Sequence, residues 1–153
     1  MDELIKELYE AWGVKDYHLS QPDYAKYVKD AHRILVENAK AGKVVYYGEL
    51  PVFNVLKERF GDDAARLIGL ILGACSEYEA SRGRPLISSI VVSQDTSEPG
   101  RGFYGLAAVP VSLSTATWEG QGKKPPQIVI GKREDFWLDE LQDTLDYWAI
   151  HEV

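Results

Sequence analysis

Few side chains in this sequence combine the residue type and the spacing that chemistry requires. His18, His32 and His151 lie far apart and show no metal-ligand spacing. The chain has neither a phosphate-binding GxxxxGKS/T loop nor a G-x-S-x-G nucleophile elbow. Adjacent carboxylates such as Asp62 and Asp63 would diverge by about 100° on a helix, so they are poor partners for sharing a proton or a metal ion. These observations argue against the common hydrolases and predict no metal site and no cofactor.

The single cysteine, Cys75, excludes an internal disulfide and a multi-cysteine metal site. It ends the longest apolar run, residues 67–75, which Gly69 and Gly73 interrupt. Such a run is too short to span a membrane, so we expect a buried helix that carries an inert core thiol. The acidic start of the chain is unlike a secretory signal, and we therefore expect a cytoplasmic protein.

Negative charge is concentrated at the end of the chain. The net charge is −7, from 24 acidic and 17 basic residues. Residues 134–153 contain no lysine or arginine and hold seven of the acids, so the other residues carry 17 charges of each sign. These seven are Glu134, Asp135, Asp139, Glu140, Asp143, Asp146 and Glu152. The acidic segment is either a solvated helix face or a surface for a basic partner that contacts Asp139, Asp143 and Asp146.

Periodicity predicts an α+β domain in which helices dominate and the β-sheet is short. We expect helices over residues 2–12, 22–41, 52–60, 64–81 and 134–153, strands over 43–47 and 86–93, and a possible strand over 127–130. The whole chain, 1–153, forms one domain. It consists of an N-terminal helical pair (1–42), a helix-and-wing module (43–106) and an acidic C-terminal helix (134–153).

Four motifs follow one another in the helix-and-wing module. They are Val44-Val45-Tyr46-Tyr47-Gly48-Glu49-Leu50, Ala64-Ala65-Arg66-Leu67-Ile68-Gly69, Pro85 with Val91-Val92, and Gly100-Arg101-Gly102-Phe103. In this order they resemble the DNA-binding domain of alkylguanine-DNA alkyltransferases and alkyltransferase-like proteins. The resemblance implies a winged-helix-like helix-turn-helix. Residues 83–103 also resemble small bacterial and phage proteins of uncharacterised function.

The catalytic motif of that family is absent. Where the alkyltransferases have Pro-Cys-His-Arg, this chain has Pro85-Leu86-Ile87-Ser88-Ser89. Without the thiol and its histidine no nucleophile can accept an alkyl group. Cys75 lies on the preceding helix and cannot substitute, so we expect no dealkylation activity.

The resemblance implies roles for three residues, and each has a structural alternative. Arg66 would fill the gap that a flipped base leaves, or it could pair with Asp62. Tyr47 would contact the DNA backbone, or it could be a packed strand aromatic. Arg101 would reach phosphate from the tip of the wing, or it could be a solvated turn residue.

Arg84 and Ser88 complete the candidate DNA-binding set. Ser88 and Ser89 are adjacent on an expected strand, so at most one of the two hydroxyls would be available to a ligand.

Three functions fit these patterns. The first is a non-catalytic module that recognises duplex or distorted DNA. The second is an acidic interaction protein of the inhibitor or immunity type, which covers a basic, nucleic-acid-handling partner. The third is a ligand-binding protein or an enzyme that uses the loop from Thr96 to Phe103, where a glycine-rich backbone could approach phosphate. DNA binding requires Arg66, Arg84 and Arg101 to converge on one face, away from the acidic helix.

Overall fold

The computed structural model describes residues 1–150 and shows a helix-rich α+β domain with a small two-stranded sheet. Its α-helices are α1 (Asp2–Ala11), α2 (Gln21–Lys40), α3 (Pro51–Phe60), α4 (Ala64–Ser81) and α5 (Gln127–Ile150), and its strands are β1 (Val45–Tyr46) and β2 (Val91–Val92). The helices expected over residues 2–12 and 22–41 are confirmed as α1 and α2. None of the described helices is long and apolar enough to cross a lipid bilayer.

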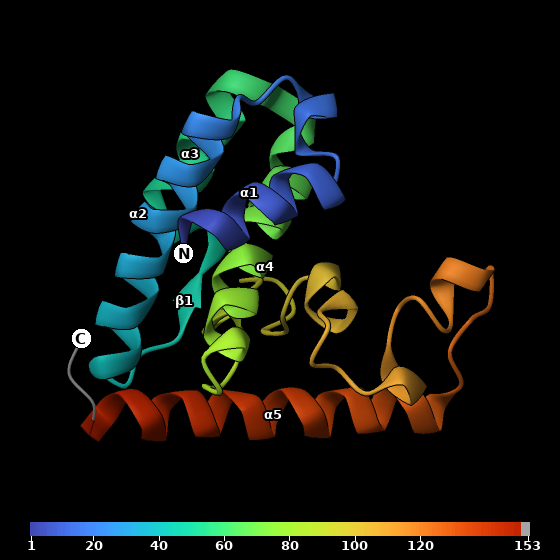
Figure 1. Ribbon diagram of the computed structural model, residues 1–153. Helices are drawn as coiled ribbons and strands as arrows, with labels where there is room; N and C mark the ends of the chain where they lie inside the picture. Colours follow the sequence, from blue (N-terminus) through green and yellow to red (C-terminus); the bar gives the residue numbers. More distant parts are fainter. Residues whose placement is uncertain (151–153) are drawn as a thin grey trace.

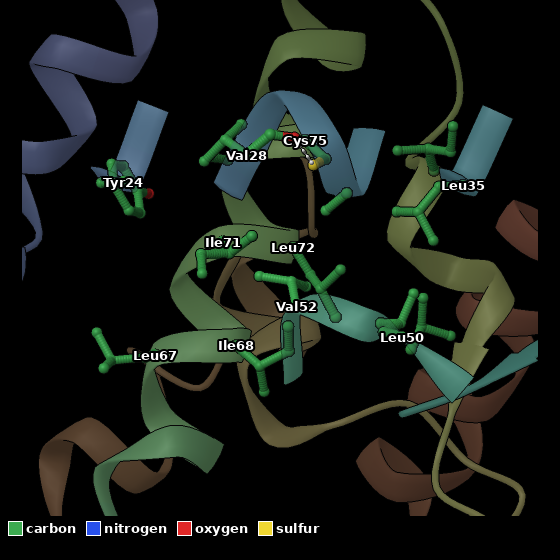
Figure 2. Packing of buried hydrophobic residues seen from close by; sticks show 14 of the residues in the cluster. Tyr24, Val28, Leu35, Leu50, Val52, Leu67, Ile68, Ile71, Leu72 and Cys75 are labelled. Carbon is green, nitrogen blue, oxygen red and sulfur yellow. Dashed lines mark hydrogen bonds between the residues drawn. The ribbon is translucent and has the colours of Figure 1, made fainter. Parts of the chain in front are cut away.

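Helix α4 forms the centre of the core. Its sequence is apolar on nearly all sides, so it is stable only where other elements cover it on all sides. Helices α1, α2 and α3 pack around it, and Figure 2 shows Leu67, Ile68 and Ile71 on this helix among the buried side chains. The burial predicted for Cys75 is confirmed, because its side chain is fully buried and its thiol donates to the Val28 carbonyl oxygen (3.5 Å).

The sheet is smaller than the sequence predicts. Strands β1 and β2 are parallel, with Val45 opposite Val91 and Tyr46 opposite Val92. The first half of the strand expected over residues 86–93 is wrong, because Ile87–Ile90 forms a short 3-10 helix, η4. The Ser88 N–H donates to the Ser76 hydroxyl oxygen and the Ser89 N–H donates to the Leu86 carbonyl oxygen. These local and tertiary bonds replace the partners that a longer ladder would have supplied.

Helix α5 lies across one end of the molecule, where α4 ends (Figure 1). It begins at Gln127, so the strand considered for residues 127–130 is wrong and the start expected at 134 is seven residues late. The N–H groups of Val129 and Ile130 donate to the Pro126 carbonyl oxygen, which begins the helix directly after the proline pair. The last three positions of the expected acidic helix lie outside the described residues.

The helices of the helix-and-wing prediction form, and its strands form in shortened length, but the structure does not confirm the wing. Helices α3 and α4 are consecutive and are joined by η3 (Gly61–Asp63), with Gly61 at a positive φ of 56°. Residues 93–100 form turns, in which the Ser93 N–H donates to the Glu98 carbonyl oxygen and the Ser97 N–H donates to the Ser93 carbonyl oxygen. Within residues 1–150 these turns have no paired strands, so they do not form a β-hairpin wing.

Candidate interaction surface

The arginines of the candidate DNA-binding set lie at opposite ends of α4. Arg66 is exposed on the first turn, and Arg84 follows the last turn. A helix of 18 residues is about 27 Å long, so the two side chains are far apart and do not converge. The side chain of Arg66 forms no ion pair or hydrogen bond with another described residue, so the alternative role of pairing with Asp62 is not seen. The side chain of Arg101 lies outside the part of the chain that the structure describes.

Arg84 is engaged inside the protein. Its Nε and Nη2 both donate to Oε2 of the fully buried Glu79, at 3.1 and 2.6 Å. The guanidinium carbon lies 5.6 Å from the ring centre of Tyr78 and 5.7 Å from that of Trp148. This arginine joins the end of α4 to α5. The sequence offers one signal for the pair, namely a carboxylate at Glu79 four residues after Cys75 on the buried side of α4.

Tyr47 and Ser88 also have partners within the protein. The Gly100 N–H donates to the Tyr47 hydroxyl oxygen (3.0 Å), and burial raises the pKa of this tyrosine. Tyr47 therefore holds the turn segment 93–100 in place. Ser88 is only 7% exposed, and its hydroxyl oxygen accepts a 2.6 Å hydrogen bond from Ser76. Ser89 faces Thr144 of α5 at 3.1 Å, so neither serine hydroxyl faces solvent.

Four aspartates of α5 form one exposed row, which we name the acidic face: Asp135, Asp139, Asp143 and Asp146. Their spacing of four, four and three residues places them on one side of the helix, with successive rises of about 6.0, 6.0 and 4.5 Å. The opposite side of α5 is buried through Trp137, Thr144 and Trp148, and the Trp137 indole N–H donates to the Ser89 carbonyl oxygen (2.9 Å). Because this side of α5 is buried, the acidic face on the other side is exposed to solvent.

The three aspartates predicted as a partner surface do come together, and Asp135 extends their row. The sequence-based set omitted Asp135, although its distance of four residues from Asp139 is a signal for the same helix face.

The charges of the acidic face are not neutralised within the described residues. No lysine or arginine forms an ion pair with these four carboxylates, and Asp146 only accepts a 2.8 Å hydrogen bond from the Gln142 amide. The nearest cation in the sequence on their N-terminal side, Arg133, binds both carboxylate oxygens of Glu119 at 2.9 Å. Like charges three or four residues apart on a helix repel one another. The acidic face therefore destabilises the helix that carries it.

Glu140 lies at the edge of the acidic face and is half-buried. Burial raises the pKa of its carboxyl group, the Leu86 N–H that donates to Oε1 opposes this shift, and Asp143 and Asp139 add to it. Burial is thus the main cause of the shift, and two aspartates of the acidic face add to it.

Apolar side chains border the acidic face. Leu138 is 44% exposed and lies beside Asp139. Ile150, on the last turn, is 80% exposed. A row of charges that borders exposed aliphatic groups can contribute both orientation and buried apolar area to a protein–protein contact.

Comparison of this chain with protein-family models, with curated proteins and with solved structures finds no match.

Proposed function

We propose that this protein is an acidic interaction protein that binds a cationic surface of a partner protein through the acidic face of α5. One observation carries the proposal. Four aspartates occupy one exposed side of α5, where they repel one another and have no cation among the described residues. A cationic partner that binds there offsets the repulsion between the aspartates. The bound complex then contains the ion pairs that the free helix lacks.

The sign of the charge selects the class of partner. DNA and RNA phosphates are repelled by a row of carboxylates, whereas Lys- and Arg-rich surfaces are attracted to it. Strongly cationic protein surfaces are typical of nucleic-acid-handling proteins, because those surfaces neutralise phosphates. An acidic helix on such a surface would occupy the place of the nucleic acid. The protein would then act as an inhibitor or immunity-type partner.

The rigid presentation of the carboxylates favours selective binding. Trp137 and Trp148 fix α5 against the core, so the four carboxylates keep a constant spacing. A partner that presents cations at the matching spacing does not have to order the helix on binding. We therefore expect selectivity for the spacing of cations and not only for their number.

A direct test uses a labelled helical peptide with lysines on one side at the spacing of the acidic face. A second peptide of identical composition distributes the lysines around the helix. Fluorescence anisotropy at low and high salt should show tighter, salt-sensitive binding of the first peptide by the wild-type protein. The triple substitution Asp139→Asn, Asp143→Asn and Asp146→Asn should weaken this binding at least about tenfold, the equivalent of roughly 1.4 kcal/mol.

The chain supplies a matched control on another helix. Glu3, Glu7 and Glu10 are exposed on α1, and their joint replacement by glutamine changes the net charge by the same amount. The control should bind like the wild type. Equal loss in both triple variants, or equal affinity for both peptides, would show that only net charge matters and would refute the proposed site.

Duplex DNA is the second candidate ligand, and one observation favours it. Arg66 is exposed and unpaired among the described residues at the start of the second helix of the α3–α4 pair, far from α5 along α4. Only a short stretch of α4 around Arg66 is accessible. The Tyr24 hydroxyl donates to the Leu70 carbonyl oxygen, and a side chain at Gly73 would meet Trp12, so α4 is covered beyond its first two turns.

Titration of labelled duplexes separates the two candidates. If DNA is a ligand, Arg66→Ala should weaken salt-sensitive binding, while replacement of the exposed Arg82 should leave it unchanged. Wild-type protein that shows no binding in low salt would exclude duplex DNA and leave the cationic partner.

A further inference from the structure

A groove of about 300 Å³ lies between α2 and α3, outside the surfaces discussed above. Its apolar lining includes Ile34 of α2 and Val52 and Val55 of α3. Val55 is 39% exposed, so part of this apolar lining is open to solvent. A groove between two helices with an apolar lining is suited to receive a third helix.

Charges of alternating sign line the α2 side of this groove. Lys26, Asp30 and Arg33 are separated by four and three residues, so they lie within about 60° around the helix with successive rises of about 6.0 and 4.5 Å. Lys26 and Asp30 form no ion pair with a described residue. Arg33 lies 3.6 Å from Glu37, but both side chains are largely exposed, so this pair is weak and exchangeable.

The outer side of α5 carries the complementary series in the opposite order. Asp139, Gln142 and Asp146 are separated by three and four residues, which gives rises of about 4.5 and 6.0 Å on one helix face. If α5 runs antiparallel to α2, these residues align in register with the groove. Asp139 then faces Arg33, the Gln142 amide faces Asp30, and Asp146 faces Lys26.

The apolar groups agree with this register. Leu138 borders the row on α5 and is 44% exposed, while Val55 in the groove is 39% exposed. Leu138 precedes Asp139 by one residue, so an antiparallel contact brings it to the Arg33 end of the groove, where Ile34 belongs to the apolar lining. The same docking cannot form within one chain, because α5 already packs on its own α2 through the opposite side of the helix, where Trp148 is buried.

We propose that the acidic face of α5 docks, antiparallel to α2, into the α2–α3 groove of a second copy of this protein. The inference rests on the proposed function, because it takes the acidic face as a protein-binding surface and names one surface whose two cations, Lys26 and Arg33, match its spacing. Groove and helix are different surfaces, so the contact is heterologous and builds a closed pair only if both contacts form at once. Self-association then covers the acidic face, and a foreign cationic partner competes with it.

Sedimentation velocity over a concentration series tests the contact. The wild-type protein should associate at low salt and dissociate as salt rises. Arg33→Glu and Asp139→Lys should each weaken association at least about tenfold, since each places like charges opposite one another. An equimolar mixture of the two variants should associate again. In the mixture the intact Arg33 of one variant meets the intact Asp139 of the other, and the two reversed residues also attract.

Charge reversals outside the contact serve as controls, with Arg82→Glu and Glu10→Lys expected to associate like the wild type. Circular dichroism of every variant verifies that it is folded. A wild-type protein that stays monomeric at its highest attainable concentration in low salt overturns the inference. Separate variants that associate normally, or a mixture that does not recover, overturn it as well.

The same variants separate this inference from the proposed function. Arg33→Glu leaves the acidic face intact, so it should still bind the lysine peptide while it loses self-association. Asp139→Lys should lose both. A monomeric wild type that binds the peptide refutes only the second-copy contact, whereas self-association without spacing-selective peptide binding refutes the proposed foreign partner.

Discussion

Glu79 and Arg84 form a buried ion pair at the junction of α2, α4 and α5. The Glu79 carboxylate is fully buried, and its Oε2 accepts hydrogen bonds from both Nε and Nη2 of Arg84. His32 of α2 approaches the same oxygen at 3.5 Å, and the Arg84 guanidinium lies over the Trp148 ring of α5. One cation therefore balances a core carboxylate and at the same time holds α5 in the position that exposes its aspartates.

Replacing Arg84 with methionine should destabilise the fold by about 3 kcal/mol or more, because it leaves the buried Glu79 carboxylate without its cation. Urea denaturation measures the free energy of unfolding. Glu79→Gln in the same chain should recover part of the loss, since it removes the uncompensated charge. Arg66→Ala is the control and should change stability by less than about 0.5 kcal/mol, because Arg66 is exposed. Equal unfolding energies for Arg84→Met and the wild type would contradict the structural role.

Glu140→Gln should stabilise the protein at neutral pH and not at acid pH. Burial raises the pKa of the Glu140 carboxyl group in the folded state above its ordinary value of 4.5. The ionised form is therefore disfavoured by folding, and this penalty is present above the raised pKa and disappears as the pH falls below the ordinary value. Glutamine keeps an oxygen that can accept from the Leu86 N–H. Denaturation at several pH values should show a difference between variant and wild type that shrinks on acidification; a pH-independent difference would argue against this origin.

Asp143→Asn should raise the free energy of unfolding by roughly 0.6–1.5 kcal/mol, the sum over three like-charged pairs. Asp143 lies four residues from Asp139 and three from both Glu140 and Asp146, and each like-charged pair at this spacing costs about 0.2–0.5 kcal/mol. The gain should shrink in high salt, which screens exposed charges. Thermal or urea denaturation at two ionic strengths measures it. A destabilised variant would mean that Asp143 has a favourable partner in the folded chain.

Gly100→Ala should destabilise the turn segment 93–100 by about 1–3 kcal/mol, the usual cost of overpacking. A Cβ at this position would overlap the Tyr47 hydroxyl oxygen and lie 3.3 Å from its Cζ. The matched control is Gly102→Ala, because a Cβ there meets no atom within 4 Å. In a Tyr47→Phe background the Gly100→Ala penalty should fall, and the double-mutant cycle gives the coupling. Additive effects would show that the contact does not form.

Cys75 should react slowly with thiol reagents in the native protein. Its side chain is fully buried in α4, and burial raises the pKa of the thiol, so the reactive thiolate is scarce. Labelling followed by mass spectrometry should show rapid modification only after denaturation. Rapid stoichiometric labelling of folded protein would contradict the packing around α4.

Elements whose pattern is strong over several turns could be predicted from the sequence. Helices α1 and α2 follow from their apolar periodicity, and the apolar run of residues 67–75 correctly indicates a buried helix that contains Cys75. The acidic side of α5 was also predictable, since seven acids without a lysine or arginine in residues 134–153 cannot lie inside a core.

Short segments were decided by contacts between residues far apart in the chain. Ile87–Ile90 has the composition of a strand, yet it forms a 3-10 helix because the Ser76 hydroxyl and the Trp137 indole bond its backbone. Those two partners belong to α4 and α5, so no local pattern announces them.

For individual polar residues, too, some properties follow from the sequence and others only from the tertiary structure. Composition by itself determined that residues 134–153 carry an excess of negative charge, which no lysine or arginine in that segment neutralises. Only the tertiary structure decided that Arg84 pairs with Glu79 and that Ser88 bonds with Ser76. It also decided that Arg66 and the aspartates of α5 stay exposed. The physical reason is that the sequence states the charge and the polarity of a side chain, whereas burial and pairing depend on which distant elements pack against it.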